Sequence, residues 1–128
     1  MGYVQAYACF LRDYKPEWEL IEKPLFSLDL GYAGTLDRFG CIDGEQAIVD
    51  IKTSASANRA TRIAWAVQLT AYLALLGCPA AKRYNLWLKK DGSYQLVSAS
   101  KTEQKYKFNA DVLFSMLLDI IKITGGSK

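Results

Sequence analysis

The triplet Asp50-Ile51-Lys52 follows a short apolar run at residues 47–49, a pattern that predicts a strand ending in charged residues. Side chains two residues apart on a strand share one face, so Asp50 and Lys52 should project together, with Ile51 buried on the other side. A carboxylate beside an ammonium group could bind a divalent cation and orient an attacking water. The triplet alone is a weak indication, because such pairs more often form surface ion pairs at strand ends.

A second carboxylate, Asp37, lies on the preceding predicted strand, over residues 32–39. The strand that carries Asp50 is predicted over 46–53. The two strands are joined through Asp43-Gly44, which is typical of a tight hairpin because both turn positions need positive φ. The hairpin should therefore bring the two carboxylates side by side. They would repel each other unless a cation lies between them, and Mg²⁺ is commonly held by one or two carboxylates.

The predicted helix that follows, over 59–76, carries polar side chains on one face. Gln68 and Tyr72 are four residues apart, and Trp65 lies one turn earlier. Most of the surrounding helix is apolar, so Gln68 would be a polar group in a largely buried element. Such a group needs a hydrogen-bond partner, which backbone or substrate near the preceding strand could provide. Trp65 and Tyr72, taken alone, favour core packing.

The composition limits the chemistry that is available. The chain has 128 residues, half of them apolar, and a net charge of +3, which is compatible with a polyanionic partner. It contains no histidine, which excludes histidine bases and histidine-ligated zinc. Its three cysteines are far apart and have no CxxC spacing, so we expect reduced thiols and no zinc or iron–sulfur site. A metal would be held by oxygen, to which the main-chain carbonyl of Ile51 could contribute.

The remaining elements indicate a single α/β domain over residues 1–128 with a central mixed sheet flanked by helices. The expected order is α-β-β-β-α-β-β-α, and no signal peptide or membrane-spanning segment is predicted. Besides the elements above, we expect a helix at 2–13, strands at 18–22 (with a continuation at 25–29), 84–89 and 94–98, and a helix from about 109 to 123.

Three motifs in this order resemble the PD-(D/E)XK nuclease superfamily: Gly34 to Asp37, Asp50 to Lys52, and Gln68 to Tyr72. The pattern GxxD, DxK, QxxxY is most similar to the RecB-type and phage-exonuclease-like branch. The resemblance implies a restriction-endonuclease-like αβββαβ core. Two departures are the absence of the upstream histidine of many RecB-type members and of the four-cysteine cluster of some relatives.

The resemblance also implies roles for individual residues. Asp37 and Asp50 match the metal-binding acids, and Lys52 matches the catalytic lysine. Gln68 and Tyr72 match a helix motif that helps to hold the substrate and the active site. Glu22 lies where many members carry an upstream acid, although an exposed strand charge explains it equally well.

The function implied is that of a Mg²⁺- or Mn²⁺-dependent deoxyribonuclease. An exonuclease of phage or bacterial DNA recombination or repair, in the cytoplasm of a bacterium or an infected host, fits best. One alternative is a catalytically silent module that binds nucleic acid or a protein. Another is an enzyme acting on a different phosphate substrate, although the chain has no GxxxxGK loop. Whether this is a minimal nuclease or part of a longer protein stays open.

Partners follow from the surface residues. DNA phosphates could contact Arg38, Thr53, Arg59 and Arg62, and the last two are favoured because they open the helix after the active strand. Other basic candidates are Lys82, Arg83, Lys89 and Lys90. The apolar face of the last helix could pack internally or against another subunit, in a homo-oligomer or a larger recombination complex.

Overall fold

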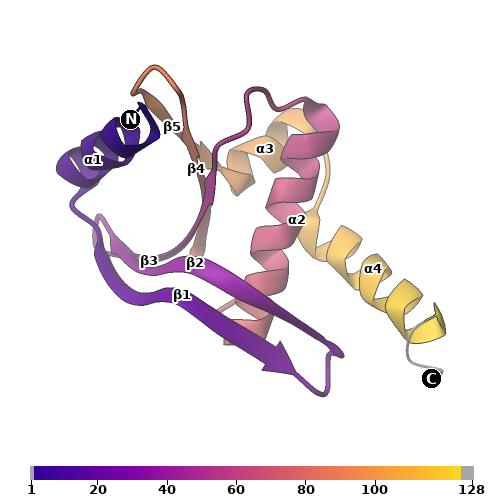
Figure 1. Cartoon of the computed structure of the whole chain (residues 1–128). Helices are drawn as coiled ribbons and strands as arrows, with labels where there is room; N and C mark the ends of the chain where they lie inside the picture. Colours follow the sequence, from indigo (N-terminus) through magenta and orange to yellow (C-terminus); the bar gives the residue numbers. More distant parts are fainter. Residues whose placement is uncertain (1, 125–128) are drawn as a thin grey trace.

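The computed structural model describes residues 2–124 (Figure 1). Five strands form one sheet in the order β1-β2-β3-β4-β5. β3 and β4 are parallel, and the other neighbours are antiparallel. The elements are α1 (Gly2–Tyr14), β1 (Glu17–Ser27), β2 (Tyr32–Ile42), β3 (Glu45–Lys52), α2 (Arg59–Leu76), β4 (Lys82–Leu88), β5 (Tyr94–Ser98), α3 (Ala99–Tyr106) and α4 (Ala110–Thr124).

Helices cover both faces of the sheet. α1 lies on one face, whereas α2 crosses the other face as the connection between the parallel strands β3 and β4 (Figure 1). α3 and α4 lie on the side of α2. The fold is therefore α/β, with the expected αβββαβ order followed by β5 and two helices. None of the helices within residues 2–124 has the length and hydropathy needed to cross a bilayer.

The hairpin between β2 and β3 forms as predicted. Ile42 pairs with Glu45, which leaves a two-residue turn at Asp43 and Gly44. Their φ angles are 52° and 79°, the left-handed region that such a turn needs at both positions. This turn sets the register of the strands that carry Asp37 and Asp50.

β1 is one continuous strand through Pro24, which confirms the expected continuation but ends it at Ser27 rather than residue 29. β1 is an edge strand, and an edge strand tolerates proline because the missing N–H need not pair. The register shifts between Trp18 and Leu20, and Glu22 has a φ of 49°.

α2 has the predicted bounds, because both of its ends are capped. The side chain of Asn58 accepts a hydrogen bond from the N–H of Thr61, and its backbone is extended. Gly77 has a φ of 76° and donates its N–H to the carbonyl of Leu73, a left-handed stop. These caps hold α2 at the length that presents Gln68 and Tyr72 to the sheet.

The helix α3 was not predicted, so the expected order lacked one helix. Its sequence, ASKTEQKY, has little apolar periodicity, and its buried residues are Ala99 and Thr102. Ser98 caps its start by accepting from the N–H of Lys101 at 3.4 Å. Its caps and its packing against α2, β4 and β5 stabilise this helix.

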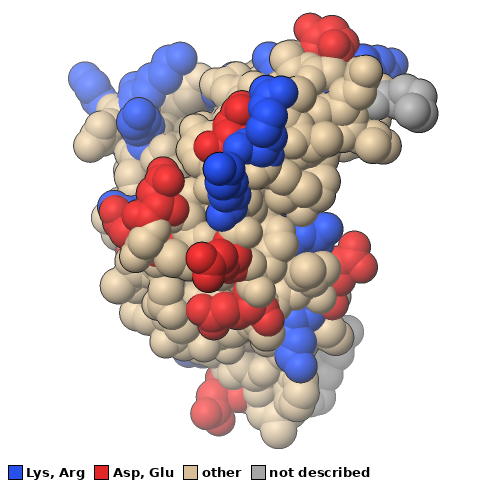
Figure 2. Space-filling model, turned by 90° about the vertical axis from the view of Figure 1, so that its left-hand side faces the viewer, with Lys and Arg blue, Asp and Glu red and all other residues tan. Residues whose placement is uncertain are grey.

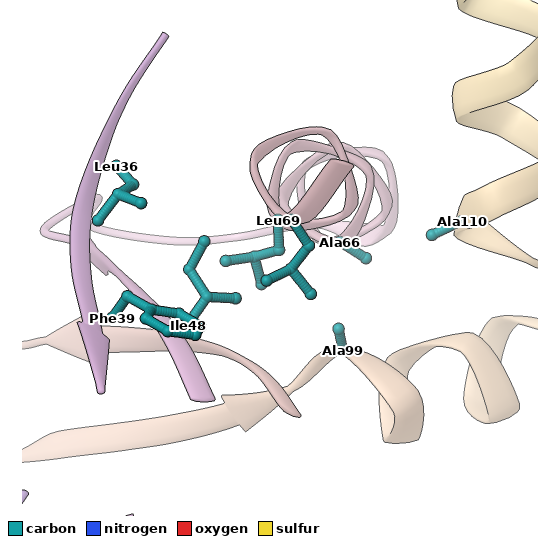
Figure 3. Close-up of a cluster of buried hydrophobic side chains, with 8 residues drawn as sticks. Leu36, Phe39, Ile48, Ala66, Leu69, Ala99 and Ala110 are labelled. Atoms are coloured by element: carbon teal, nitrogen blue, oxygen red, sulfur yellow. The ribbon is translucent and has the colours of Figure 1, made fainter. Parts of the chain in front are cut away.

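Two main apolar clusters lie on opposite faces of the sheet. The α2-side cluster joins Ile48 and Leu36 of the sheet to Ala66 and Leu69 of α2 (Figure 3). In the α1-side cluster, Phe10 of α1 packs against Val49 and other strand residues. α4 docks through Ala110 and Phe114, and Val112, Met116 and Leu117 stay between 45% and 56% exposed. Internal packing therefore leaves much of its apolar face uncovered.

Candidate metal and phosphate site

The hydrogen-bond ladder between β2 and β3 stops just before the candidate acids. Its last pair is Arg38 with Val49. Beyond that point, Oδ2 of Asp37 accepts a hydrogen bond from the N–H of Ile51 at 2.8 Å. A side chain thus takes over from the backbone ladder and anchors Asp37 against the end of β3. The predicted proximity of Asp37 and Asp50 depends on this bond as well as on the hairpin.

The alternation along β3 is as predicted. Ile51 packs in the α1-side cluster, and Ile48 packs in the α2-side cluster. Asp50 and Lys52 share the face of Ile48, and the Nζ of Lys52 lies 2.7 Å from Oδ2 of Asp50. The two charged groups therefore project together beneath α2.

Gln68 links this strand to α2. Its Oε1 accepts a hydrogen bond from Nζ of Lys52 at 2.8 Å, and its Nε2 donates to the hydroxyl of Tyr72 at 3.1 Å. Sequence reasoning expected a partner near β3, and that partner is the lysine side chain itself. Side-chain contacts thus join the β3 motif, Asp50 and Lys52, to the α2 motif, Gln68 and Tyr72.

Asp50 is held in an unfavourable environment for a carboxylate. Its side chain is almost buried, with 5% of the residue exposed, and Oδ2 makes no hydrogen bond of regular geometry with described residues. Burial raises the pKa of Asp50 to about 6, and the adjacent Asp37 adds to this rise, whereas Lys52 opposes it. A cation bound here would relieve both the burial and the repulsion between the acids.

Gly34 and Tyr72 meet where β2 passes under α2. A Cβ atom at Gly34 would lie 2.8 Å from Cε1 of the tyrosine ring, so this position leaves room for the ring. Burial raises the pKa of Tyr72, and the nearby charge of Asp50 contributes to the rise. The first and third motifs are thus in direct contact.

Asn85 belongs to this site, although no sequence motif singled it out. It is registered beside Asp50 on the parallel strand β4 and is 2% exposed. Two residues further, Trp87 contacts Trp65 of α2, so Asn85 faces the same side of the sheet as Asp50. Its Nδ2 has no hydrogen-bond partner among described residues. The sequence feature that could have identified Asn85 is its position as a polar residue among the apolar residues of a strand.

Two of the four predicted nucleic-acid contacts, Arg38 and Thr53, directly follow Asp37 and Lys52 in the sequence. Nε of Arg38 donates to the hydroxyl of Tyr7 of α1 at 3.3 Å, and its guanidinium also donates to the carbonyl of Asp37. Arg38 therefore faces α1, because successive strand residues point to opposite faces. Thr53 is exposed just beyond β3, and its carbonyl accepts from Tyr3.

The other predicted contacts lie at the start of α2. The Arg62 guanidinium lies 5.2 Å from the Trp87 ring centroid, and that of Arg59 lies 5.8 Å from the Tyr106 ring centroid. Arg83 was also a candidate, but it is mostly buried and pairs with Glu103. The Arg83 guanidinium contacts Glu103 of α3 and Thr70 of α2, so it is not available to a phosphate.

The acidic centre is a pair. Within the described part of the chain, no three His, Cys, Asp or Glu side chains are placed to hold one metal. Glu22 is exposed in β1 and is not brought into a common group with Asp37 and Asp50. A metal ligand role for Glu22, and for the carbonyl of Ile51, stays a prediction.

Comparisons with known proteins add little to this geometry. No family model matches the chain, and no curated protein matches it. Twelve chains of solved structures match the fold. One is the crystal structure of SSO0001, with 18% sequence identity and a TM-score of 0.43. The match covers 84% of this chain and 55% of SSO0001, so the chain spans about half the length of that protein.

Proposed function

We propose that the protein is a divalent-metal-dependent nuclease that hydrolyses phosphodiester bonds in DNA. The observation that carries the proposal is the pair of Asp37 and the buried Asp50, with Lys52 against Asp50. A fold gains no stability from a buried carboxylate whose pKa is raised to about 6, so such an arrangement is typical of functional sites. Phage or bacterial DNA recombination or repair in the cytoplasm is the setting that we propose.

The residues present fit a magnesium or manganese ion. Two carboxylates are a usual protein contribution to such a site, and Oδ2 of Asp50 is a buried acceptor without a regular hydrogen bond. Asp37 and Asp50 would hold the ion. When bound, it would neutralise charge on a scissile phosphate and favour a nucleophilic hydroxide at neutral pH.

The chain's own residues would then position the reacting groups. The ammonium of Lys52 would orient the attacking water or stabilise negative charge on the phosphate oxygens. Gln68 would hold Lys52 through the 2.8 Å bond, and Tyr72 would hold Gln68 in turn. Gln68 and Tyr72 are thus positioning residues for the lysine.

The test uses linear and circular DNA, with magnesium, manganese or a chelator. We expect the wild type to cleave DNA with metal and to lose this activity with chelator. We also expect the activity to be lost, with metal present, in Asp37→Asn, Asp50→Asn and Lys52→Ala. Asp37→Asn retains an oxygen that can accept from Ile51. Thermal unfolding gives a second readout, because an ion that binds the folded chain raises the Tm. Full activity of folded Asp50→Asn would refute the proposal.

A second candidate is a catalytically silent module that binds nucleic acid or a protein. The observation that favours it is the ion pair itself, in which the Lys52 ammonium already neutralises Asp50 at 2.7 Å. A metal would have to displace that contact. DNA binding without cleavage, and no Tm rise with any divalent metal, would support the silent module over the nuclease.

A homo-oligomer or a larger complex also stays a proposal. The exposed apolar face of α4 would be the contact surface, with Val112 and Met116 at its centre. Sedimentation of the wild type and of Met116→Glu would test it, because a charge on that face should disfavour association.

A further inference from the structure

Charge is unevenly divided along the chain. The first 50 residues contain nine acidic and four basic residues. The rest contains twelve basic and four acidic residues, and there is no acidic residue at all from 51 to 90. A net charge of +3 therefore conceals an acidic part and a strongly basic part.

The fold gathers part of the basic half around one groove. The groove has a volume of about 300 Å³ and lies between the start of α2, β5 and α3. Arg62, Lys101 and Lys105 line it together with Tyr106, and no acidic side chain of the described part of the chain does. Glu103 of α3 is engaged elsewhere, with Arg83 and with the N–H of Ala110.

The side of the molecule that carries α1 differs. Figure 2 shows blue and red side chains interspersed over that side. Arg12 pairs with Asp13 in α1, and Lys82 at the start of β4 pairs with Glu45 at the start of β3. In contrast, Arg62, Lys101 and Lys105 form no ion pair within residues 2–124. The groove is thus a concentration of uncompensated positive charge.

Aromatic rings lie beside two of these cations, Arg62 and Lys105. The Tyr106 ring has Arg59 at 5.8 Å and Lys105 at 5.4 Å from its centroid. The Trp87 ring has Arg62 at 5.2 Å and Lys89 at 4.5 Å. Cations held over rings lose less side-chain freedom when they bind an anion, which favours binding at this surface.

A series of aromatic contacts links the groove to the acidic site. The Nζ of Lys52 lies 5.9 Å from the Trp65 ring centroid, and that ring meets Trp87 edge to face at 5.7 Å. Trp87 in turn contacts Arg62, which lines the groove. Two indole rings therefore separate the candidate catalytic lysine from the first cation of the groove.

We propose that this groove binds one single strand of nucleic acid through its phosphates and leads that strand to Lys52. A basic groove of about 300 Å³ with a partly exposed tyrosine suits a single strand, because such sites combine phosphate contacts with stacking on aromatic rings. The second part of the proposal, delivery to Lys52, rests on the proposed function. The binding itself does not, because it needs neither metal nor cleavage.

The test measures binding of a labelled oligothymidylate by fluorescence anisotropy in chelator, over a range of salt concentrations. The variant is Lys101→Gln with Lys105→Gln, both exposed. Its matched control is Lys15→Gln with Lys23→Gln, which makes the same change in charge at exposed positions outside the groove. Circular dichroism checks that both proteins are folded.

We expect at least tenfold weaker binding by the groove variant and a slope of log K against log salt that is lower by about 1.4, since each phosphate contact to a single strand contributes about 0.7. The control should bind as the wild type does. Wild-type affinity in the groove variant, or no binding by the wild type, would overturn the proposal. A loss of affinity for a blunt duplex, with single-strand affinity intact, would overturn the assignment to a single strand.

The same binding assay separates the two proposals. Binding that depends on the two lysines, without metal-dependent cleavage of any substrate, would support the groove and refute the nuclease. Cleavage that depends on Asp50, with equal binding by variant and control, would support the nuclease and refute the groove.

Discussion

The two faces of the sheet differ in the chemical type of the strand residues that they bury. On the α1 face, β3 contributes Ala47, Val49 and Ile51 to an apolar cluster centred on Phe10. On the α2 face, the same strand contributes Ile48 to a cluster and then turns polar, at Asp50 and Lys52. One strand therefore supplies hydrophobic packing on one side and charged groups on the other.

This difference separates stability from chemistry. The α1 face places aromatic rings around Phe10, with centroids 5.2 to 6.4 Å away, and buries no carboxylate of residues 2–124. The α2 face buries Asp50 beside the ammonium of Lys52, and leaves Nδ2 of Asn85 without a hydrogen-bond partner among the described residues. Burial of unsatisfied polar groups destabilises a fold, and functional sites are where proteins commonly retain them. We expect substitutions on the two faces to have opposite consequences.

The largest expected effect is the loss of cleavage in Asp50→Asn. Removal of one of the two acids should lower kcat/KM roughly a thousandfold or more, since several kcal/mol of transition-state charge stabilisation would be lost. The measurement is the initial cleavage rate with magnesium. Asp13→Asn, on an exposed carboxylate that pairs with Arg12 near α1, is the control and should keep its rate. Equal losses of cleavage rate in Asp50→Asn and Asp13→Asn would contradict the assignment of the catalytic site to the α2 face.

The next effect is on the other face. Phe10→Ala should lower the free energy of unfolding by about 3 to 5 kcal/mol, the range for a fully buried phenylalanine. Urea denaturation measures it, with Phe26→Ala as control, because Phe26 is 73% exposed. The folded fraction of Phe10→Ala should still show a Tm rise with manganese. A loss of that rise while the chain is folded would mean that the α1 face also positions the metal site.

Stability should depend on pH through Asp50. Its pKa is about 6 in the folded chain and 3.8 as a free side chain, so the folded state binds the proton more tightly. Its stabilising contribution is present below pH 3.8 and is lost as pH rises through 6. Wild type should therefore lose about 3 kcal/mol relative to Asp50→Asn between these values. Parallel stability curves for the two proteins, measured in chelator, would contradict this.

The smallest effect concerns Asn85. Asn85→Leu removes a buried donor without a partner and should raise the free energy of unfolding by about 1 kcal/mol. Cleavage should fall, because the polar neighbour of Asp50 is lost. Thr102→Val, at a buried hydroxyl that donates to the carbonyl of Ser98, is the comparison and should not stabilise. Clear destabilisation by Asn85→Leu would mean that the amide is satisfied in the folded protein.

Local signals account for much of what was predicted. The bounds of α2 agree with the prediction, and Asn58 and Gly77 cap the helix at those bounds. The β2–β3 turn was predicted because Asp43-Gly44 suits positive φ. α3 was missed because its sequence is short and mostly polar, and it packs on α2 and β4, which are distant in sequence. Asn85 was missed because its importance comes from the register of β3 with β4, residues distant in sequence.

The sequence by itself determined the α/β class, the hairpin that carries the two acids, the length of α2, and the shared face of Asp50 and Lys52. These follow from interactions between residues close along the chain. The tertiary structure alone decided that Lys52 is the partner of Gln68, that Arg38 faces α1, and that Arg83 is used by Glu103. It also decided the raised pKa of Asp50, because burial by distant segments sets the local polarity that a carboxylate experiences.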